Sequence, residues 1–272
     1  MTTTTKPYVE QRNPPLPPSQ TLPTMYDLPS EDPEEPGLPD EFHVLQPALL
    51  SATLSLPRYA DNYFTGTDIN LYYDVHHTNW YKRPDWFLSV GVPRLYGETE
   101  LRLSYVVWQE GVSPFVAVEL LSPGTEKEDL GETTSEEGGP PTKWQVYENI
   151  LRIPYYIIFD RYNNSLRVYQ LRENGYEELI LPDNKLWIPR LNLGLGVWQG
   201  TYQGISRLWL RWFDKSGRWV KTSSEEAAAY AKRAEAEARR AEAEAKRAEA
   251  AEAELADLRK KLEAQGIALE DL

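Results

Sequence analysis

The amino-acid sequence predicts an α+β protein, or an α/β protein with a mixed sheet, that carries a long charged helix at its C-terminal end. Short segments with alternating or unbroken apolar residues, which indicate strands, recur between residues 69 and 220. Amphipathic segments at 41–56 and 143–153 indicate helices beside these strands. Ala, Glu, Arg and Lys dominate residues 225–272, which indicates that this segment is a helix without strands.

Composition divides the 272 residues into three parts. Residues 1–40 contain ten of the 21 prolines and lack a hydrophobic period, so we expect a disordered or extended spacer, or alternatively a ligand for a polyproline-binding partner. Residues 41–222 are long enough for one domain with a sizeable core. Residues 223–272 form the expected helix.

Charge and cysteine content narrow the function classes. The net charge of −13 is shared by the tail and the rest of the chain, which argues against a protein that coats nucleic acid non-specifically but allows an enzyme with a local basic lining. The absence of cysteine excludes disulfides and thiolate metal sites. Residues 1–15 lack the apolar core of a signal peptide, and no apolar run approaches the roughly 18 residues of a membrane span. We therefore expect a cytoplasmic protein that does not enter the membrane.

The elements follow in chain order. In 41–56, four leucines (45, 49, 50 and 54) are spaced for one helix face, with Pro47 near the first turn. Alternation at 69–73 predicts a strand, and further strands are expected at 85–92 and 105–108.

The strand expected at 115–122 contains an anomaly. Six apolar residues surround Glu119 without a break, which indicates a strand covered on both faces. A lone buried carboxylate is costly, so Glu119 should be paired, hydrogen-bonded, protonated or bound to a metal.

A polar, Gly- and Pro-rich loop of about 20 residues is expected at 123–142, and loops of that length are usually functional or mobile. Thr142 and Gln145 then have the spacing of a capping box that begins a helix. Projected at about 100° per residue, this helix places Lys143 at the centre of its apolar arc. A lysine in the first turn also opposes the helix dipole. Its amine either extends out to solvent or reaches carboxylates on the adjoining sheet.

Strands at 155–159 and 166–171 are expected to form a hairpin, followed by strands at 177–181 and 191–197 and by a pairing of 208–213 with 218–220. In the tail, a period of seven places Glu235/Arg239 and Glu242/Lys246 as helical pairs. Leucines 255, 258 and 262 form a short seam, so the helix either pairs weakly in a homo-oligomer or stays solvated.

Asp85, Glu119 and Lys143 form the constellation that could carry chemistry. Two carboxylates can hold a hard divalent cation through oxygen and leave positions for water and phosphate. A lysine beside them can orient the water or stabilise charge on phosphoryl oxygens.

The segments that contain these residues resemble the bacterial Uma-two family of restriction endonucleases within the PD-(D/E)xK nuclease superfamily. The resemblance rests on Arg83-Pro84-Asp85-Trp86, on 116–125, on Lys143 with Tyr147 and on 154–160, and it covers roughly 41–222 and the charged tail.

The resemblance implies a restriction-endonuclease-like core, a mixed sheet flanked by helices, in which Mg²⁺ or Mn²⁺ activates water to cleave DNA. Asp85 and Glu119 would be metal ligands, with the Leu120 carbonyl as a third oxygen. The superfamily pattern has a lysine two residues after the glutamate, where this chain has Leu121. In the Uma-two family the helix lysine, here Lys143, would take that role.

Two departures from the superfamily support an alternative, a catalytically degenerate module that binds nucleic acid or a protein partner and assembles through its C-terminal helix. The superfamily often has an acidic residue on its first helix, and residues 43–60 contain none. The loop at 123–142 is acidic and should repel phosphate unless it moves away.

Several other polar residues are weaker candidates. His76 and His77 are adjacent, so on a strand they would face opposite ways, and a polar loop explains them better than a metal pair. The remaining candidates are Asp160 as a turn residue, Asp68 and Asp74 as neighbours of the site, and Lys82 and Arg83 as backbone contacts for nucleic acid.

Overall fold

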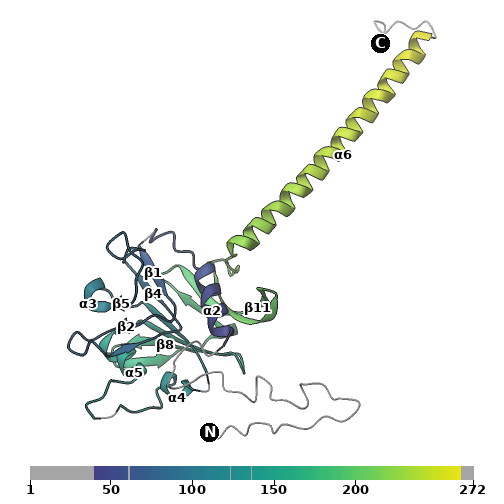
Figure 1. Cartoon of the computed structure of the whole chain (residues 1–272). Coiled ribbons are helices and arrows are strands. Elements are labelled where there is room, and N and C mark those ends of the chain that lie inside the picture. Colours follow the sequence, from purple (N-terminus) through teal and green to yellow (C-terminus); the bar gives the residue numbers. More distant parts are fainter. Residues whose placement is uncertain (1–39, 61, 123, 136, 265–272) are drawn as a thin grey trace, which may run out of the picture. The chain divides into compact units, whose positions relative to one another are not determined.

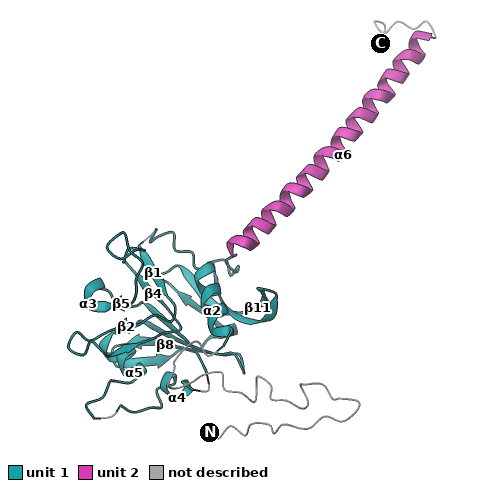
Figure 2. Cartoon of the chain, viewed as in Figure 1, with its two compact units in different colours: residues 1–220 teal, residues 221–272 magenta. Residues whose placement is uncertain are grey.

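We describe the protein from a computed structural model, which describes residues 40–60, 62–122, 124–135 and 137–264. The segment 1–39, where we expect disorder, lies outside the described residues. The chain separates into two compact units, 1–220 and 221–272 (Figure 2).

The first unit is built on a six-stranded mixed sheet (Figure 1). Its strands, in spatial order, are β1 (Tyr63–Gly66), β4 (Trp86–Val90), β6 (Val116–Leu120), β7 (Tyr155–Asp160), β8 (Ser165–Arg172) and β9 (Gly175–Glu178). Strands β6 and β7 run parallel and every other neighbouring pair is antiparallel. Every residue of β4 and β6 is buried, because apolar layers cover both faces of the sheet.

One face of this sheet packs against helix α2 and a three-stranded sheet. The elements on this side are α2 (Phe42–Ala52), η2 (Pro182–Asn184), β10 (Lys185–Ile188), β11 (Leu193–Tyr202) and β12 (Ile205–Phe213). Gln46 connects α2 to β12 through both backbone polar atoms of Leu210, at 2.8 and 2.9 Å. Their core includes Leu49, Leu50 and Trp212 with Val118 of the central sheet.

The other face carries the elements that build the candidate site. They are β2 (Leu71–Tyr72), β3 (Tyr81–Lys82), β5 (Tyr105–Val106), α3 (Val107–Glu110), α4 (Glu126–Asp129), α5 (Lys143–Gln145) and η1 (Val146–Ile150). The first three strands form a small sheet in the order β3-β2-β5. Val146 and Tyr147 pack there with Ala117 and Ile158, whose side chains point away from α2 because strand residues alternate between faces.

The predicted class, a mixed α+β arrangement with a long C-terminal helix, is confirmed, and so are the helix in 41–56, the buried strand in 115–122 and the hairpin of β7 with β8. The capping box of Thr142 and Gln145 is present with both of its hydrogen bonds. Pro47 lies inside α2, beyond the first turn.

Two predicted elements are shorter than expected, and one strand was missed. The strand expected at 105–108 ends after two residues, because α3 begins at Val107. Strand β12 pairs along its length with β11, and its predicted pairing with 218–220 is present only at its end, where Phe213 bridges to Trp219 and the Val220 N–H donates to the Trp212 carbonyl at 2.9 Å. Strand β1 was not predicted. A glycine is required at position 66 of this strand, because a Cβ there would lie 2.2 Å from the ring of Phe87.

The region 123–142 is partly helical rather than an open loop. Helix α4 lies within it, and Asp129, its last residue, is buried at 1% exposure. Part of this acidic segment is therefore inside the protein.

The second unit consists of helix α6 (Ser223–Ala264). The predicted pairs are present, with Arg239 Nη2 2.6 Å from Glu235 Oε1 and Lys246 Nζ 2.7 Å from Glu242 Oε1. Of the residues that the structure describes, none belongs to a helix that is both long and apolar enough to cross a membrane.

Candidate active site

Strand pairing places Asp85 beside Glu119. The register of β4 and β6 sets Trp86 opposite Val118, so the next pair outward is Asp85 with Glu119. Directly opposed residues of an antiparallel pair project to the same face of the sheet. The backbone N–H of Leu120 donates to Asp85 Oδ2 at 2.6 Å, and Asp85 N lies 3.4 Å from Glu119 Oε2.

Lys143 reaches the same place from the helix that covers this face. Its ammonium lies 3.2 Å from Glu119 Oε2, and the residue is only 7% exposed, so the alternative in which it extends out to solvent is excluded. Leu121 follows Glu119 by two residues and packs on the same face. A lysine at either position could therefore approach Glu119, which explains how a helix residue can replace the strand lysine.

Tyr147 holds the other oxygen of Glu119. Its hydroxyl donates to Oε1 at 2.8 Å. Lys143 and Tyr147 are four residues apart, so one helix face presents both to the carboxylate. From Val146 the helix is wound as a π-helix, a form often found at functional sites.

Asp129 is a site residue that sequence reasoning missed. Its Oδ1 lies 2.5 Å from the Lys143 ammonium, Thr125 Oγ1 donates to its Oδ2 at 2.8 Å, and Tyr156 donates to its backbone carbonyl at 2.8 Å. The ammonium thus lies between two buried carboxylates. Asp129 was hidden among six acidic residues of one polar segment, and no period distinguished it from the others.

His43 is a second residue that sequence reasoning missed. Its Nε2 lies 2.8 Å from the Leu120 carbonyl oxygen and its Nδ1 lies 2.9 Å from Asp40 Oδ1. A carbonyl and an ionised carboxylate only accept hydrogen bonds, so both ring nitrogens must donate and the imidazole is cationic. The helical spacing of His43, Gln46 and Leu50 could have indicated that all three lie on the buried face.

The pKa of His43 is raised for the same reason. Burial opposes its charged form, but the hydrogen bond to Asp40 and the charge of Asp85 outweigh burial. Helix α2 thus contributes a cation where the superfamily often has an acid.

The pKa values of the two central carboxyl groups, Asp85 and Glu119, are both raised. Burial raises the pKa of Asp85 to about 6, although His43 and Lys143 act in the opposite direction. Burial also raises the pKa of Glu119 well above its usual value, Lys143 opposes this rise, and Asp129 and Asp85 add to it. Lys143 responds to the same charges, because three carboxylates outweigh its burial and raise its pKa. Three carboxyl groups and the two cations Lys143 and His43 therefore influence one another at this buried place.

The donor set fits a hard divalent cation. All side-chain donors are carboxylate oxygens, which suit Mg²⁺ or Mn²⁺, and Mg²⁺ retains several waters so that one or two carboxylates suffice. Within the described part of the chain, no group of three or more His, Asp or Glu side chains is already arranged around one point.

Most of the other sequence candidates have polar partners of their own, and Asp68 donates its backbone N–H to the carbonyl of Pro84, next to Asp85, at 3.1 Å. His77 pairs with Asp74 at 2.7 Å in an exposed loop, and Arg83 pairs with Asp68 at 2.6 Å. Asp160 accepts from the Tyr162 N–H at 2.8 Å, as expected of a turn residue.

Lys82 lies at the margin of the site. Its Nζ is 2.8 Å from Glu128 Oε1, an oxygen that also accepts from the Lys143 backbone N–H at 3.2 Å. Lys82, Glu128 and Thr142 line a pocket of about 350 Å³.

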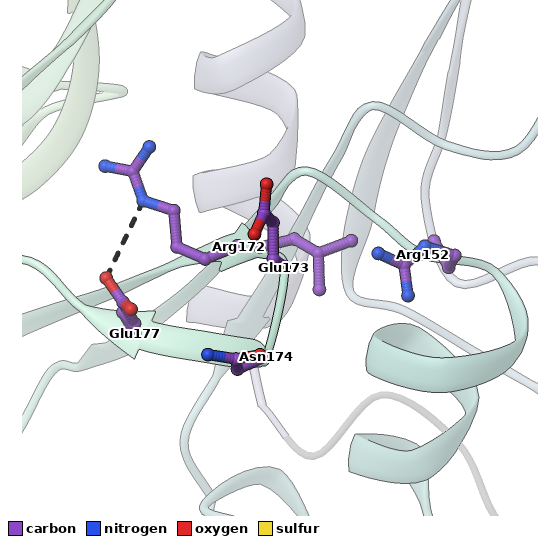
Figure 3. Close-up of a pocket in the computed structure, with 6 residues that line it drawn as sticks. Arg152, Arg172, Glu173, Asn174 and Glu177 are labelled. Carbon is purple, nitrogen blue, oxygen red and sulfur yellow. Dashed lines mark ion pairs between the residues drawn. The ribbon is translucent and has the colours of Figure 1, made fainter.

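A second pocket is unrelated to this cluster (Figure 3). An ion pair of 3.7 Å between Arg172 and Glu177 crosses part of it. None of the site residues is among its lining residues, which are Arg152, Leu171, Arg172, Glu173, Asn174 and Glu177.

Comparisons with known proteins bear on the family. A search of curated proteins finds no match. Among solved structures, one match is described as a putative nuclease belonging to DUF820 from Anabaena variabilis; it is 15% identical, the match covers 57% of this chain and 76% of that one, and the TM-score is 0.38.

The family model of Uma2, described as "Putative restriction endonuclease", matches residues 16–202. This match spans more than half of the chain and contains Asp85, Glu119, Asp129 and Lys143. The chain therefore belongs to the Uma2 restriction endonuclease family.

Proposed function

We propose that this protein is a metal-dependent endonuclease that uses Mg²⁺ or Mn²⁺ to hydrolyse phosphodiester bonds of DNA in the cytoplasm. Membership of the Uma2 family supports nuclease activity on nucleic acid. The observation that carries the proposal is the opposition of Asp85 and Glu119 at the end of β6, with the Lys143 ammonium 3.2 Å from Glu119.

In this proposal Asp85 and Glu119 hold the metal ion, with the Leu120 carbonyl as a third oxygen. When bound, the ion supplies charge stabilisation at the phosphoryl oxygens and lowers the pKa of water. Lys143 orients the attacking water or stabilises charge on the phosphate. Tyr147 fixes the rotamer of Glu119 through its hydrogen bond to Oε1.

The test is nicking of supercoiled plasmid DNA with Mg²⁺ or Mn²⁺. We expect Glu119→Gln and Lys143→Ala to reduce the nicking rate by at least about a hundredfold, because each removes a charge used in the transition state. Glu126→Gln and Lys127→Ala are matched controls, since both side chains are exposed on α4. Nicking that persists in Glu119→Gln and Lys143→Ala would come from a contaminant or from another site. A wild-type protein that does not nick DNA would rule out the proposed endonuclease function.

The second candidate function is a degenerate nuclease fold that binds nucleic acid or a protein partner without cutting. The observation that favours it is the Leu120 carbonyl, which His43 already engages at 2.8 Å. Calorimetry distinguishes the two functions, because a degenerate site should bind Mn²⁺ no better in wild type than in Asp85→Ala. An active site should lose at least about tenfold in affinity in that variant.

A further inference from the structure

Asp129 has no role in the chemistry proposed above, yet it makes the shortest contact of the site. Its carboxylate is 1% exposed and lies 2.5 Å from the Lys143 ammonium, closer than Glu119 at 3.2 Å. A buried carboxylate is costly to desolvate, so its retention needs a compensating interaction. Lys143 provides that interaction.

The segment around Asp129 is fastened to the surrounding elements. Tyr156 of β7 donates to its backbone carbonyl, and Thr125 donates to its second carboxylate oxygen. The neighbouring Glu128 accepts from Lys82 of β3 and from the backbone N–H of Lys143. These contacts fix helix α4 at the margin of the site, and the acidic segment thereby supplies one carboxylate, that of Asp129, to the Lys143 ammonium.

Geometry also shows why one carboxylate alone would hold Lys143 poorly. Glu119 is shared, because Tyr147 occupies Oε1 and the ammonium shares Oε2 with the backbone N–H of Asp85 at 3.4 Å. If Glu119 bound a divalent cation, its attraction for the Lys143 ammonium would weaken. Asp129 would keep the lysine in place, because Asp129 faces it from the other side.

We propose that Asp129 is a positioning residue that holds the Lys143 ammonium beside Glu119 when Glu119 binds a metal ion. This inference rests on the proposed nuclease function and adds a fifth side chain to Asp85, Glu119, Lys143 and Tyr147. Asp129 acts through the lysine and does not itself touch the substrate.

The kinetic test compares three variants of the full-length protein in single-turnover plasmid nicking. Asp129→Asn keeps the shape and removes the charge, and we expect a decrease of at least about tenfold in rate with DNA affinity within about twofold of wild type. Asp129→Glu restores the charge and should recover part of the rate. Glu126→Gln removes an equal charge from the exposed side of α4 and should stay within about twofold of wild type.

Crystal structures of wild type and Asp129→Asn give a readout that needs no activity. With Mn²⁺ in both crystals, we expect the lysine ammonium to leave its position beside Glu119 in the variant, because the metal ion then competes for that carboxylate. If the variant nicks at the rate of Glu126→Gln, or if Lys143 stays in place without Asp129, the proposal is overturned. If the wild-type protein does not nick DNA, the nuclease function is refuted. The crystal structures of wild type and Asp129→Asn then test by themselves whether Asp129 holds Lys143 in place.

A second variant serves if Asp129→Asn does not fold. Thr125→Val removes the hydroxyl that donates to Asp129 Oδ2 and nearly preserves shape. We expect a rate decrease of about threefold or more from loosened positioning. An unchanged rate in a folded Thr125→Val protein would contradict the proposal.

Discussion

At the residue scale, Glu119 shows how a buried carboxylate is tolerated. Tyr147 donates a hydrogen bond to one of its carboxylate oxygens, and the Lys143 ammonium pairs with the other. Water cannot take these places, because Glu119 lies in a buried, apolar strand. Burial is the main cause of the raised pKa values of both Asp85 and Glu119, and Lys143 opposes this rise at each of them. A divalent cation would favour the charged forms of both carboxyl groups.

The hydrogen bond from Tyr147 can be tested through stability. Tyr147→Phe leaves Glu119 Oε1 without its buried donor, so we expect the free energy of unfolding to fall by about 1–3 kcal/mol. Urea denaturation measures the change. Tyr162→Phe is the matched control, because Tyr162 is 63% exposed, and it should be nearly neutral. Equal stability of the two variants would show that the Tyr147 hydroxyl does not support Glu119.

The pKa of Asp85 predicts how metal affinity depends on pH. Below its raised pKa of about 6, Asp85 is protonated and a metal ion must displace the proton. We expect Mn²⁺ affinity to rise by about tenfold per pH unit between about pH 5 and pH 6 and to level off above, as far as Asp85 alone is concerned. Calorimetry over this range measures the slope.

The control for this prediction is Asp85→Asn, which removes the titrating group. The remaining slope then belongs to Glu119, whose pKa is also raised. A wild-type affinity independent of pH would indicate that Asp85 is not a metal ligand.

At the element scale, two helices meet at the end of β6 from opposite faces of the sheet. Helix α5 with η1 brings Lys143 and Tyr147 to one face, and α2 brings His43 to the Leu120 carbonyl from the other. Helix α2 is held by polar contacts as well as apolar ones, since Trp212 Nε1 donates to the Leu50 carbonyl at 3.0 Å. The position of α2 therefore affects the end of β6 that carries Glu119 and Leu120.

The docking of α2 predicts a pH-dependent stability. Because the folded-state pKa of His43 is raised above 6.5, its stabilising contribution is complete below about pH 6.5 and is lost as pH rises through the folded-state value. His43→Gln should therefore lower the free energy of unfolding more at about pH 6 than at about pH 9.

Urea unfolding of wild type and variant at both pH values measures this difference. His76→Gln, in an exposed loop, is the control and should show no such difference. If the cost of His43→Gln is the same at both pH values, His43 does not carry the charge inferred from its two acceptors.

At the scale of the whole molecule, the chain combines a compact unit, 1–220, with a second unit that consists of helix α6. None of the residues of α6 is buried, and Leu255 and Leu258 are about half exposed. Ion pairs along the helix stabilise it by only about 0.2–0.5 kcal/mol each. Burial of the leucine seam against a second copy would add hydrophobic stabilisation.

We predict weak homo-oligomerisation through α6. Full-length protein should show a mass in solution that rises with concentration, and deletion of 225–272 should give a monomer at every concentration. Light scattering coupled to gel filtration measures both. Leu258→Glu should act like the deletion, whereas Glu249→Gln, which lies off the leucine seam, should not. Monomeric full-length protein would show that the helix is solvated.

Three features could be predicted from the sequence alone, because they depend on local interactions. They are the buried strand that contains Glu119, the capped helix that begins at Lys143, and the charged final helix. Unbroken apolar runs, capping pairs and i,i+4 charges act between near neighbours, so they can be read in one dimension. The sequence placed Asp85 and Glu119 in one candidate constellation, but their opposition across two paired strands came from the tertiary structure, because register between strands is not a local property.

Tertiary structure alone decided the roles of Asp129 and His43. The six acidic residues of 123–142 are equivalent in one dimension, and only packing against Tyr156 and Lys143 selects Asp129 for burial. His43 is charged because folding brings Asp40 and the Leu120 carbonyl, 77 residues away from it, to its two nitrogens. Desolvation makes these long-range contacts decisive, since a buried charge must find a partner wherever the chain provides one.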